Sequence, residues 1–538
     1  MKNKIRNPII PGYTPDPSIC RVGEDFYVVC SSMELDPGIP IYHSRDLAHW
    51  EQIGNVMSAE NHYHVKQNSM IGGMMAPTLR YFNGTFYLIA ANFSHNGNFI
   101  VTAKNPAGPW SEPHWLEDVP GIDASIFFDN DGTCYMTGTG DVWENEGGRM
   151  ERGIWVAKYD MEHYKVVGKP FTIFNSALRV GSTPESPHIY HIGDYYHLLI
   201  AEGGTEHYHA VMHARSKELF RFFEANPSNP VLTHRHMGFQ SPIINIGHAD
   251  ITDLPDGSWA AVMLGSRLVD GTKLLGRETF YCPLVWERDW PLFSPETGKV
   301  EWEYDAPESL PWTDYPPEPT WIGFDGGKAD PRWTTWGTPY GNPFRVSDSR
   351  FFIRCIPQSL INQIRRLAEE KAVVYDHFAP VYGMRQTQPV QTVSAQMTFL
   401  PKEGETAGLA LIRAMNYQIH FERCCTDGRQ LLRLVLTTAE FDSLPYYPGF
   451  SCENKAVVLA ETEYASSDII LQAELDHLRF TFRYGSTKEE LRELCTADGR
   501  QICPEQIGCM TGNLIGIFAS GNGRDSVNEA AFDWFELK

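Results

Sequence analysis

Short apolar runs separated by turns cover most of the chain, and in its first half they form a repeat. Five segments share one pattern: a polar or small residue leads an apolar strand, a turn with Gly and Asp or Asn follows, and an aromatic-rich strand returns. Each segment predicts a β-hairpin, because an Asx/Gly turn between two strand-like runs is the strongest short-range hairpin signal. The five hairpins begin at Asp16, Ala76, Asp123, Ser186 and His248.

Further strand-like sequence lies between the hairpins, so that each period holds about four strands. Successive hairpins start 47 to 63 residues apart, which is close to the length of a β-propeller blade. We therefore expect residues 1–310 to form a five-bladed β-propeller. A β-sandwich with coincidental hairpins is the alternative, and five copies in one register disfavour it.

The second half predicts a separate all-β domain. Residues 311–322 are rich in proline and predict a linker, and residues 323–538 predict a β-sandwich of the jelly-roll type. Alternating strand patterns occupy the segments 390–400, 407–421, 430–436, 469–483, 512–518 and 530–537. One helix is expected over Ser359 to Ala372, where Leu360, Ile364 and Leu367 recur at helical spacing.

Charge and composition narrow the class of protein. The chain has 538 residues and a formal net charge of −22, from 45 basic and 67 acidic side chains. This balance disfavours a nucleic acid or an anionic membrane surface as partner, since either would favour a basic face. No secretory signal and no apolar run of ~20 residues is visible, and the 11 cysteines are interpreted as reduced thiols. We expect a cytoplasmic protein, and a homo-oligomer stays open.

The repeat brings acidic residues together. The first strand of every propeller blade lines the central axis, so the leading positions of the five repeats converge there. Asp16 and Asp123 lead their repeats, Glu185 stands directly before Ser186, and His248 leads the fifth. A buried carboxylate is costly unless it is paired or hydrogen-bonded. Three acids at one repeat position therefore indicate function, whereas a single Asp would more simply cap a turn.

Clustered carboxylates fit either metal binding or general acid–base hydrolysis of a glycosidic bond. Hydrolysis needs one ionised base and one protonated acid, and a third nearby carboxylate raises the pKa of the acid by repulsion. A metal site would favour several His–carboxylate pairs at short spacing, which are not visible. The pattern thus favours hydrolysis.

Several motifs resemble glycoside hydrolase family 43, in particular its β-xylosidases and α-L-arabinofuranosidases. The residues that carry the resemblance span the propeller in order and include Tyr13-Thr-Pro-Asp-Pro, Gly121-Ile-Asp-Ala-Ser, Thr183-Pro-Glu-Ser-Pro, Gly247-His-Ala-Asp and Leu275-Gly-Arg-Glu-Thr. Gly323-Phe-Asp-Gly-Gly and Phe532-Asp-Trp-Phe resemble, more loosely, the concanavalin-like sandwich of many of these enzymes.

The resemblance implies roles for individual residues. Asp16 corresponds to the general base that activates water, Asp123 to the carboxylate that tunes and orients the acid, and Glu185 to the general acid. Arg277 corresponds to an arginine that contacts the sugar. His248 corresponds to an axial histidine that in some members approaches a hydrated calcium. The family inverts the anomeric configuration and requires no cofactor, so calcium is an open addition.

The departures from the family pattern concern the sugar-contacting wall. Met74-Met75 replaces a tryptophan that is common before Ala76, and Ser186 follows the acid where glycine is common. We expect Met75, together with Arg277 and His248, to bind the sugar. The resemblance thus implies an exo-acting, inverting glycosidase that releases terminal β-D-xylosyl or α-L-arabinofuranosyl residues from short plant-derived oligosaccharides, with another sugar still open. A non-catalytic sugar-binding propeller and a fructan hydrolase with a carboxylate nucleophile are the alternatives.

Overall fold

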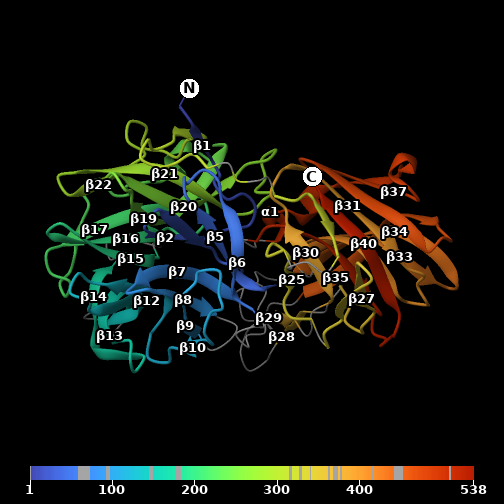
Figure 1. Ribbon diagram of the computed structural model, residues 1–538, viewed down its shortest axis with the longest axis horizontal. Coiled ribbons are helices and arrows are strands. Elements are labelled where there is room, and N and C mark those ends of the chain that lie inside the picture. Colours follow the sequence, from blue (N-terminus) through green and yellow to red (C-terminus); the bar gives the residue numbers. More distant parts are fainter. Residues whose placement is uncertain are drawn as a thin grey trace.

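The computed structural model is all-β and consists of a five-bladed propeller followed by a two-sheet sandwich, which confirms the predicted fold class (Figure 1). The residues it describes are 2–58, 73–92, 97–144, 150–175, 183–313, 315, 318–325, 330–339, 341–360, 364–366, 373–375, 379–414, 417–441, 452–507 and 511–538. No helix in these ranges is long and apolar enough to span a membrane.

Each blade is a sheet of four antiparallel strands arranged in the order of the sequence. Blade I contains β2 (Ser18–Val22), β3 (Asp25–Val29), β5 (Gly38–Ser44) and β6 (Glu51–Met57), and blade II contains β7 (Met74–Phe82), β8 (Thr85–Asn92), β9 (Gly97–Ala103) and β10 (His114–Trp115). Blade III contains β11 (Ile122–Phe128), β12 (Cys134–Glu144), β13 (Met150–Asp160) and β14 (Lys165–Asn175). Blade IV contains β15 (Glu185–Ile192), β16 (Tyr195–Glu202), β17 (Ala210–Ser216) and β18 (Glu224–Ala225), and blade V contains β19 (Ile243–Asp253), β20 (Trp259–Arg267), β21 (Glu278–Glu287) and β22 (Trp290–Phe293).

The amino-terminal segment crosses blade V and helps to close the ring. β1 (Lys4–Arg6) pairs with β23 (Glu303–Asp305), and the backbone N–H of Ile9 donates to Thr279 of β21 at 2.9 Å. No strand is shared between blades I and V in the described part of the chain, since each four-stranded sheet is complete in sequence order. Closure therefore depends on side chains and on this crossing segment.

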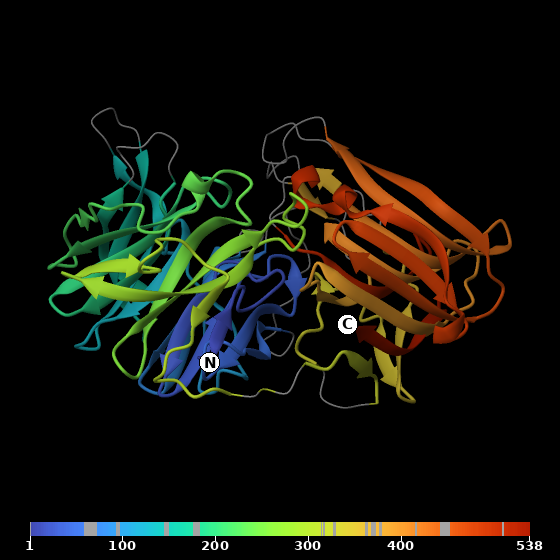
Figure 2. The ribbon, with the colours of Figure 1, turned by 90° about the horizontal axis from the view of Figure 1, so that it is seen from above.

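The sandwich stacks an eight-stranded sheet on a six-stranded one (Figure 2). The larger sheet contains β24 (Trp321–Gly323), β26 (Phe344–Ser347), β27 (Arg350–Arg354), β40 (Glu529–Leu537), β31 (Val390–Thr398), β36 (Asp468–Asp476), β37 (Arg479–Gly485) and β38 (Arg492–Asp498). The smaller sheet contains β30 (Val381–Arg385), β39 (Leu514–Ser520), β32 (Thr406–Ala414), β33 (Tyr417–Thr426), β34 (Arg429–Phe441) and β35 (Cys452–Glu463). A short helix, α1 (Pro504–Ile507), precedes β39.

Two details of the predicted second domain are wrong. The segments 407–421 and 469–483 are not single strands, because each spans parts of two paired strands, β32 with β33 and β36 with β37. The helix expected over Ser359 to Ala372 is contradicted by β28 (Ile364–Arg366), which pairs with β29 (Val373–Tyr375); the other residues from 361 to 372 lie outside the described part. The β-branched and aromatic residues of β29 favour strand pairing over the helical spacing.

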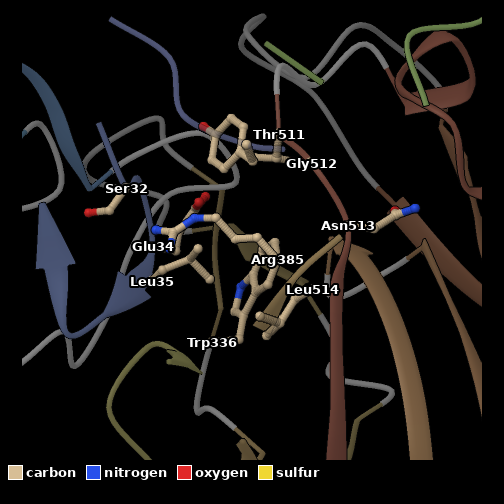
Figure 3. A pocket seen from close by; sticks show the side chains of 10 residues that line it. Ser32, Glu34, Leu35, Trp336, Arg385, Thr511, Gly512, Asn513 and Leu514 are labelled. Atoms are coloured by element: carbon tan, nitrogen blue, oxygen red, sulfur yellow. The ribbon is translucent and has the colours of Figure 1, made fainter. Parts of the chain in front are cut away.

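The sandwich packs its smaller sheet against the propeller. One apolar cluster combines Val29 and Leu35 of the propeller with Ala410, Leu514 and Phe518 of that sheet. The short strands β4 (Leu35–Asp36) and β25 (Thr335–Trp336) also pair across the boundary. A small pocket lies at this contact, and Figure 3 shows its lining residues, among them Ser32 and Glu34 from the propeller and Trp336, Arg385 and Asn513 from the sandwich.

Candidate active site

The leading residue of every repeat has a left-handed backbone. The φ angles are 55° at Asp16, 45° at Ala76, 52° at Asp123, 54° at Ser186 and 48° at His248. This conformation costs a non-glycine residue about 1–2 kcal/mol, so its recurrence in all five blades marks a shared constraint. In blades II to V it coincides with a break in the strand register. Such bulges redirect side chains, often beside active sites.

The bulge explains why Glu185 stands one residue before the repeat position. In a regular strand, neighbouring side chains point to opposite faces, so Glu185 and Ser186 would face away from each other. The register shift between Glu185 and His188 interrupts that alternation. Glu185 is the first residue of β15 and is half-buried. Met75 holds the equivalent place in blade II, directly before Ala76, and is half-buried on β7.

Asp16 is held as a buried anion. Only 6% of its surface is exposed, its Oδ1 accepts a bond from Arg277 Nη1 at 3.0 Å, and its Oδ2 accepts one from the Ser31 hydroxyl at 2.6 Å. His248 Nδ1 lies 3.4 Å from Oδ1. Burial alone would raise the pKa of Asp16, but Arg277, His248 and Ser31 together hold it well below its ordinary value. Asp16 is therefore ionised and able to accept a proton.

Asp123 is joined to Asp16 through two side chains. The Ser186 hydroxyl donates to Asp123 Oδ2 at 3.0 Å, and Ser186 Oγ also lies 3.0 Å from His248 Nδ1. Burial raises the pKa of Asp123 above its ordinary value, and the charge of Asp16 adds to this, while His248 and Ser186 oppose it. Burial lowers the pKa of His248, but Asp16 and then Asp123 outweigh that effect and raise it. The surroundings thus lower the pKa of Asp16 and raise the pKa of Asp123 within one site.

Arg277 is buried beside the predicted base and stands on a loop that the sandwich contacts. Arg277 Nη1 also donates to Thr205 Oγ1 at 3.1 Å. Three residues earlier, the backbone carbonyl of Leu274 accepts a hydrogen bond from Arg413 of β32, a fully buried side chain that also donates to Ile502 O at 3.0 Å. The second domain therefore braces the segment that carries Arg277.

The side chains around His248 do not fit a calcium ion bound directly by the protein. His248 Nδ1 is engaged with Ser186 and Asp16, and among the described residues no group of three or more His, Cys, Asp or Glu side chains is placed to hold a metal. Calcium binds six to eight oxygen ligands. The expectation of a hydrated calcium near His248 stays a prediction.

The structure thus brings Asp16, Asp123, His248 and Arg277 into one polar site. Glu185 and Met75 are half-buried residues that directly precede the leading residues of their blades. The roles predicted for these six residues stay predictions. Sequence reasoning missed Ser31, which also accepts the backbone N–H of Ala76 at 2.7 Å, and Thr205. Neither residue occupies a leading position of a repeat, so no sequence pattern pointed to them.

Models of two protein families match the chain. Residues 5–291 match the model described as glycosyl hydrolases family 43. Residues 322–538 match the model described as the β-xylosidase C-terminal concanavalin A-like domain.

Full-length relatives carry names for two sugars. The chain is 37% identical to a xylosidase/arabinosidase of Butyrivibrio fibrisolvens, over 99% of both chains. It is also 37% identical to a non-reducing end α-L-arabinofuranosidase of Bacteroides ovatus, over 99% of this chain and 94% of that one. A solved xylan β-1,4-xylosidase from Bacillus halodurans superposes with a TM-score of 0.87 at 26% identity, covering 99% of this chain and 100% of that one.

Proposed function

The chain belongs to the glycosyl hydrolases of family 43, and from that premise we propose that it is an inverting exo-glycosidase that releases single terminal pentosyl residues from short oligosaccharides. The observation that carries the proposal is the buried link from an ionised Asp16 through His248 and Ser186 to Asp123. Environments that shift the pKa values of two carboxyl groups in opposite directions are typical of acid–base catalysis.

Asp16 acts as the general base in this proposal. An inverting enzyme attacks the anomeric carbon with water in one step, so its base must be ionised in the resting state. The ion pair with Arg277 and the bond from Ser31 supply that ionisation despite burial. Arg277 is placed beside the base, where it can also donate to a sugar hydroxyl.

Glu185 acts as the general acid, and Asp123 adjusts it. The acid must keep its proton until the leaving oxygen takes it. The negative charge of a neighbouring carboxylate raises the pKa of an acid and so retains that proton. Asp123 stands on blade III, beside the blade that begins with Glu185, and its Oδ2 accepts a bond from Ser186, the next residue after the acid.

The sugar is a terminal β-D-xylosyl or α-L-arabinofuranosyl residue. One full-length relative is named a xylosidase/arabinosidase and another an α-L-arabinofuranosidase. The half-buried Met75 offers a flexible apolar wall instead of a flat aromatic ring. A thioether side chain adapts to different ring shapes, which supports activity on both a pyranosyl and a furanosyl substrate.

Two measurements on one preparation test the proposal. A panel of 4-nitrophenyl β-D-xyloside, α-L-arabinofuranoside and β-D-galactoside should show turnover of the first two and little of the third. Proton NMR of the first-formed sugar should show the inverted anomer, because water attacks opposite to the leaving group. No turnover on any pentoside contradicts the proposed substrate class, and a retained anomer contradicts the single displacement.

A further inference from the structure

The third residue of every repeat is polar and forms a second layer beneath the leading residues. Their side chains meet at the axis: Ser18 bonds to Asp250, and Ser125 lies within hydrogen-bond distance of His188, so residues of four different blades come together there. The five residues are Ser18, Thr78, Ser125, His188 and Asp250. Each has 2% or less of its surface exposed. The proposed mechanism uses none of them.

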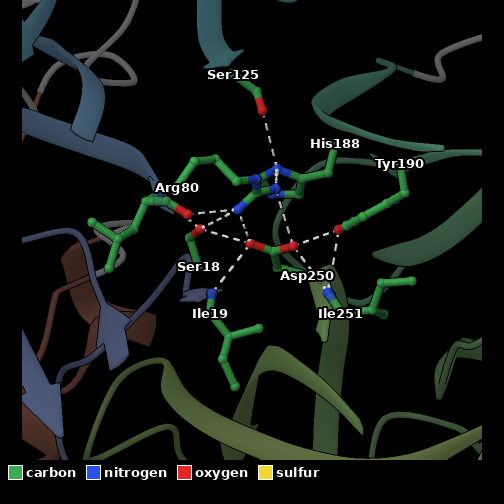
Figure 4. A network of polar contacts seen from close by, with 9 residues as sticks. Ser18, Ile19, Arg80, Ser125, His188, Tyr190, Asp250 and Ile251 are labelled. Atoms are coloured by element: carbon green, nitrogen blue, oxygen red, sulfur yellow. Dashed lines mark hydrogen bonds and ion pairs between the residues drawn. The ribbon is translucent and has the colours of Figure 1, made fainter. Parts of the chain in front are cut away.

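Asp250 of blade V is the acceptor at the centre of this layer (Figure 4). Its Oδ2 accepts bonds from Ser18 Oγ at 2.6 Å and from the backbone N–H of Ile19 at 3.1 Å, both in blade I. Arg80 of blade II donates to both carboxylate oxygens, at 2.9 and 3.2 Å. The Tyr190 hydroxyl of blade IV donates to Oδ1.

His188 connects the remaining blade to the same group. Its Nδ1 lies 3.2 Å from Arg80 Nη2 and 3.3 Å from Ser125 Oγ of blade III. An arginine has no acceptor, so Nδ1 accepts, and the ring proton resides on Nε2. We use the name axial hub for Asp250 together with four side chains. Ser18, Arg80 and Tyr190 bond to Asp250 directly, and His188 reaches it through Arg80. Together with Ser125 the axial hub joins all five blades.

The inner strands of neighbouring blades have no backbone ladder between them in the described sheets, because each strand pairs only within its own blade. Apolar clusters pack neighbouring blades against each other, and at the axis directional side-chain bonds join the blades. A buried ion pair adds little net stability compared with well-packed apolar residues. Charge-assisted bidentate bonds, however, impose a defined geometry. Apolar residues that filled the same space would not fix the relative positions of the blades in this way.

We propose that the axial hub positions the catalytic carboxyl groups, with Asp250 as its central positioning residue; this rests on the proposed function. Asp250 lies two residues after His248 on β19, Ser18 lies two residues after Asp16, and His188 lies three residues after Glu185. The bonds that hold the hub therefore also set where the predicted base and acid stand. Loosening one bond should misplace these groups without removing any of them.

Two tyrosines provide a matched test. Tyr190 and Tyr196 both belong to blade IV, and the hydroxyl of each donates a hydrogen bond to an aspartate of another blade. Tyr190 donates to Asp250 at the axis. Tyr196 donates at 2.7 Å to Asp129, which follows β11 and lies away from the axis. We expect Tyr190→Phe to lower kcat between about fivefold and 10²-fold with KM changed less than about twofold, because misplacement of reacting groups acts on the transition state. Tyr196→Phe should change kcat and KM less than about twofold.

Thermal unfolding measurements and a comparison of two Arg80 variants complete the test. Arg80→Lys keeps the charge but loses the bidentate bond, so it should retain more activity than Arg80→Gln at a temperature where both are folded. A wild-type kcat for Tyr190→Phe, or equal loss of activity and Tm in the two tyrosine variants, would overturn the positioning role. Inactivity of the wild-type protein on every pentoside would instead overturn the proposed function, so the two failures are distinguishable.

Discussion

Ser186 and Asp123 stand on neighbouring blades, and the Ser186 hydroxyl donates to Asp123 Oδ2 at 3.0 Å. The same hydroxyl oxygen lies 3.0 Å from His248 Nδ1, which in turn lies 3.4 Å from Asp16. A residue at a position where glycine is common in the family thus connects two of the three predicted catalytic carboxylates.

Replacing Ser186 by glycine removes the hydroxyl and keeps the left-handed backbone, which glycine adopts without cost. The hydroxyl bond lowers the pKa of Asp123, so its loss should raise that pKa and move the acidic limb of the pH–rate profile upward. We expect kcat/KM to fall by about 10- to 10²-fold, which corresponds to the loss of one hydrogen bond to a charged group. An unchanged acidic limb in kcat/KM, measured from pH 4 to 9, would show that Ser186 does not act on Asp123.

Glu185→Gln and Asp16→Asn should separate the acid from the base. Each should lower turnover by about 10²–10⁴-fold with folding retained. Good leaving groups need little protonation, so dinitrophenyl glycosides should partly rescue Glu185→Gln but not Asp16→Asn. Comparison of kcat for phenyl and dinitrophenyl substrates measures this, and equal losses on both substrates in the Glu185 variant would reject the assignment.

Asp123→Asn should shift the basic limb of the pH–rate profile to lower pH. Removal of its negative charge removes the repulsion that helps Glu185 to keep its proton, so the pKa of the acid falls, and the basic limb reports loss of that proton. Turnover should also drop at the new optimum, because Ser186 loses an ionised acceptor. A lowered Tm with an unshifted limb would indicate that Asp123 only caps a turn.

Buried neutral histidines should make the fold sensitive to acid. Burial lowers the pKa of His197 in blade IV and of His209 beside Gly247 to about 4. The unfolded chain binds a proton near pH 6.5, so the stabilisation is complete above that pH and is lost as the pH falls toward about 4, at about 1.4 kcal/mol per pH unit for each histidine. Thermal unfolding of the wild type and of His197→Gln at pH 7, 6 and 5 measures this. The variant, which cannot take up this proton, should lose less Tm on acidification.

Much of the propeller could be predicted because its information is local and repeated. A turn with Gly and Asp or Asn between two strand-like runs specifies a hairpin within about 15 residues, and the five copies identify the blades and the leading residues from Asp16 to His248. The helix expected near Leu360 failed for the opposite reason. A short apolar spacing is ambiguous by itself, and the pairing of Ile364–Arg366 with Val373–Tyr375 decided the outcome.

The sequence by itself determined which side chains reach the axis, since a repeated pattern places equivalent residues at equivalent positions of every blade. Only the tertiary structure decided how these residues pair. Ser186 meets Asp123 across 63 positions of sequence, Arg277 meets Asp16 across 261, and Asp250 meets Ser18 across 232. These partners meet because the ring closes and the bulges turn each leading residue, and neither closure nor bulge geometry is encoded in a local pattern. The charges that set the pKa values of Asp16 and Asp123 come from other blades, so the chemistry of the site depends on the assembled propeller.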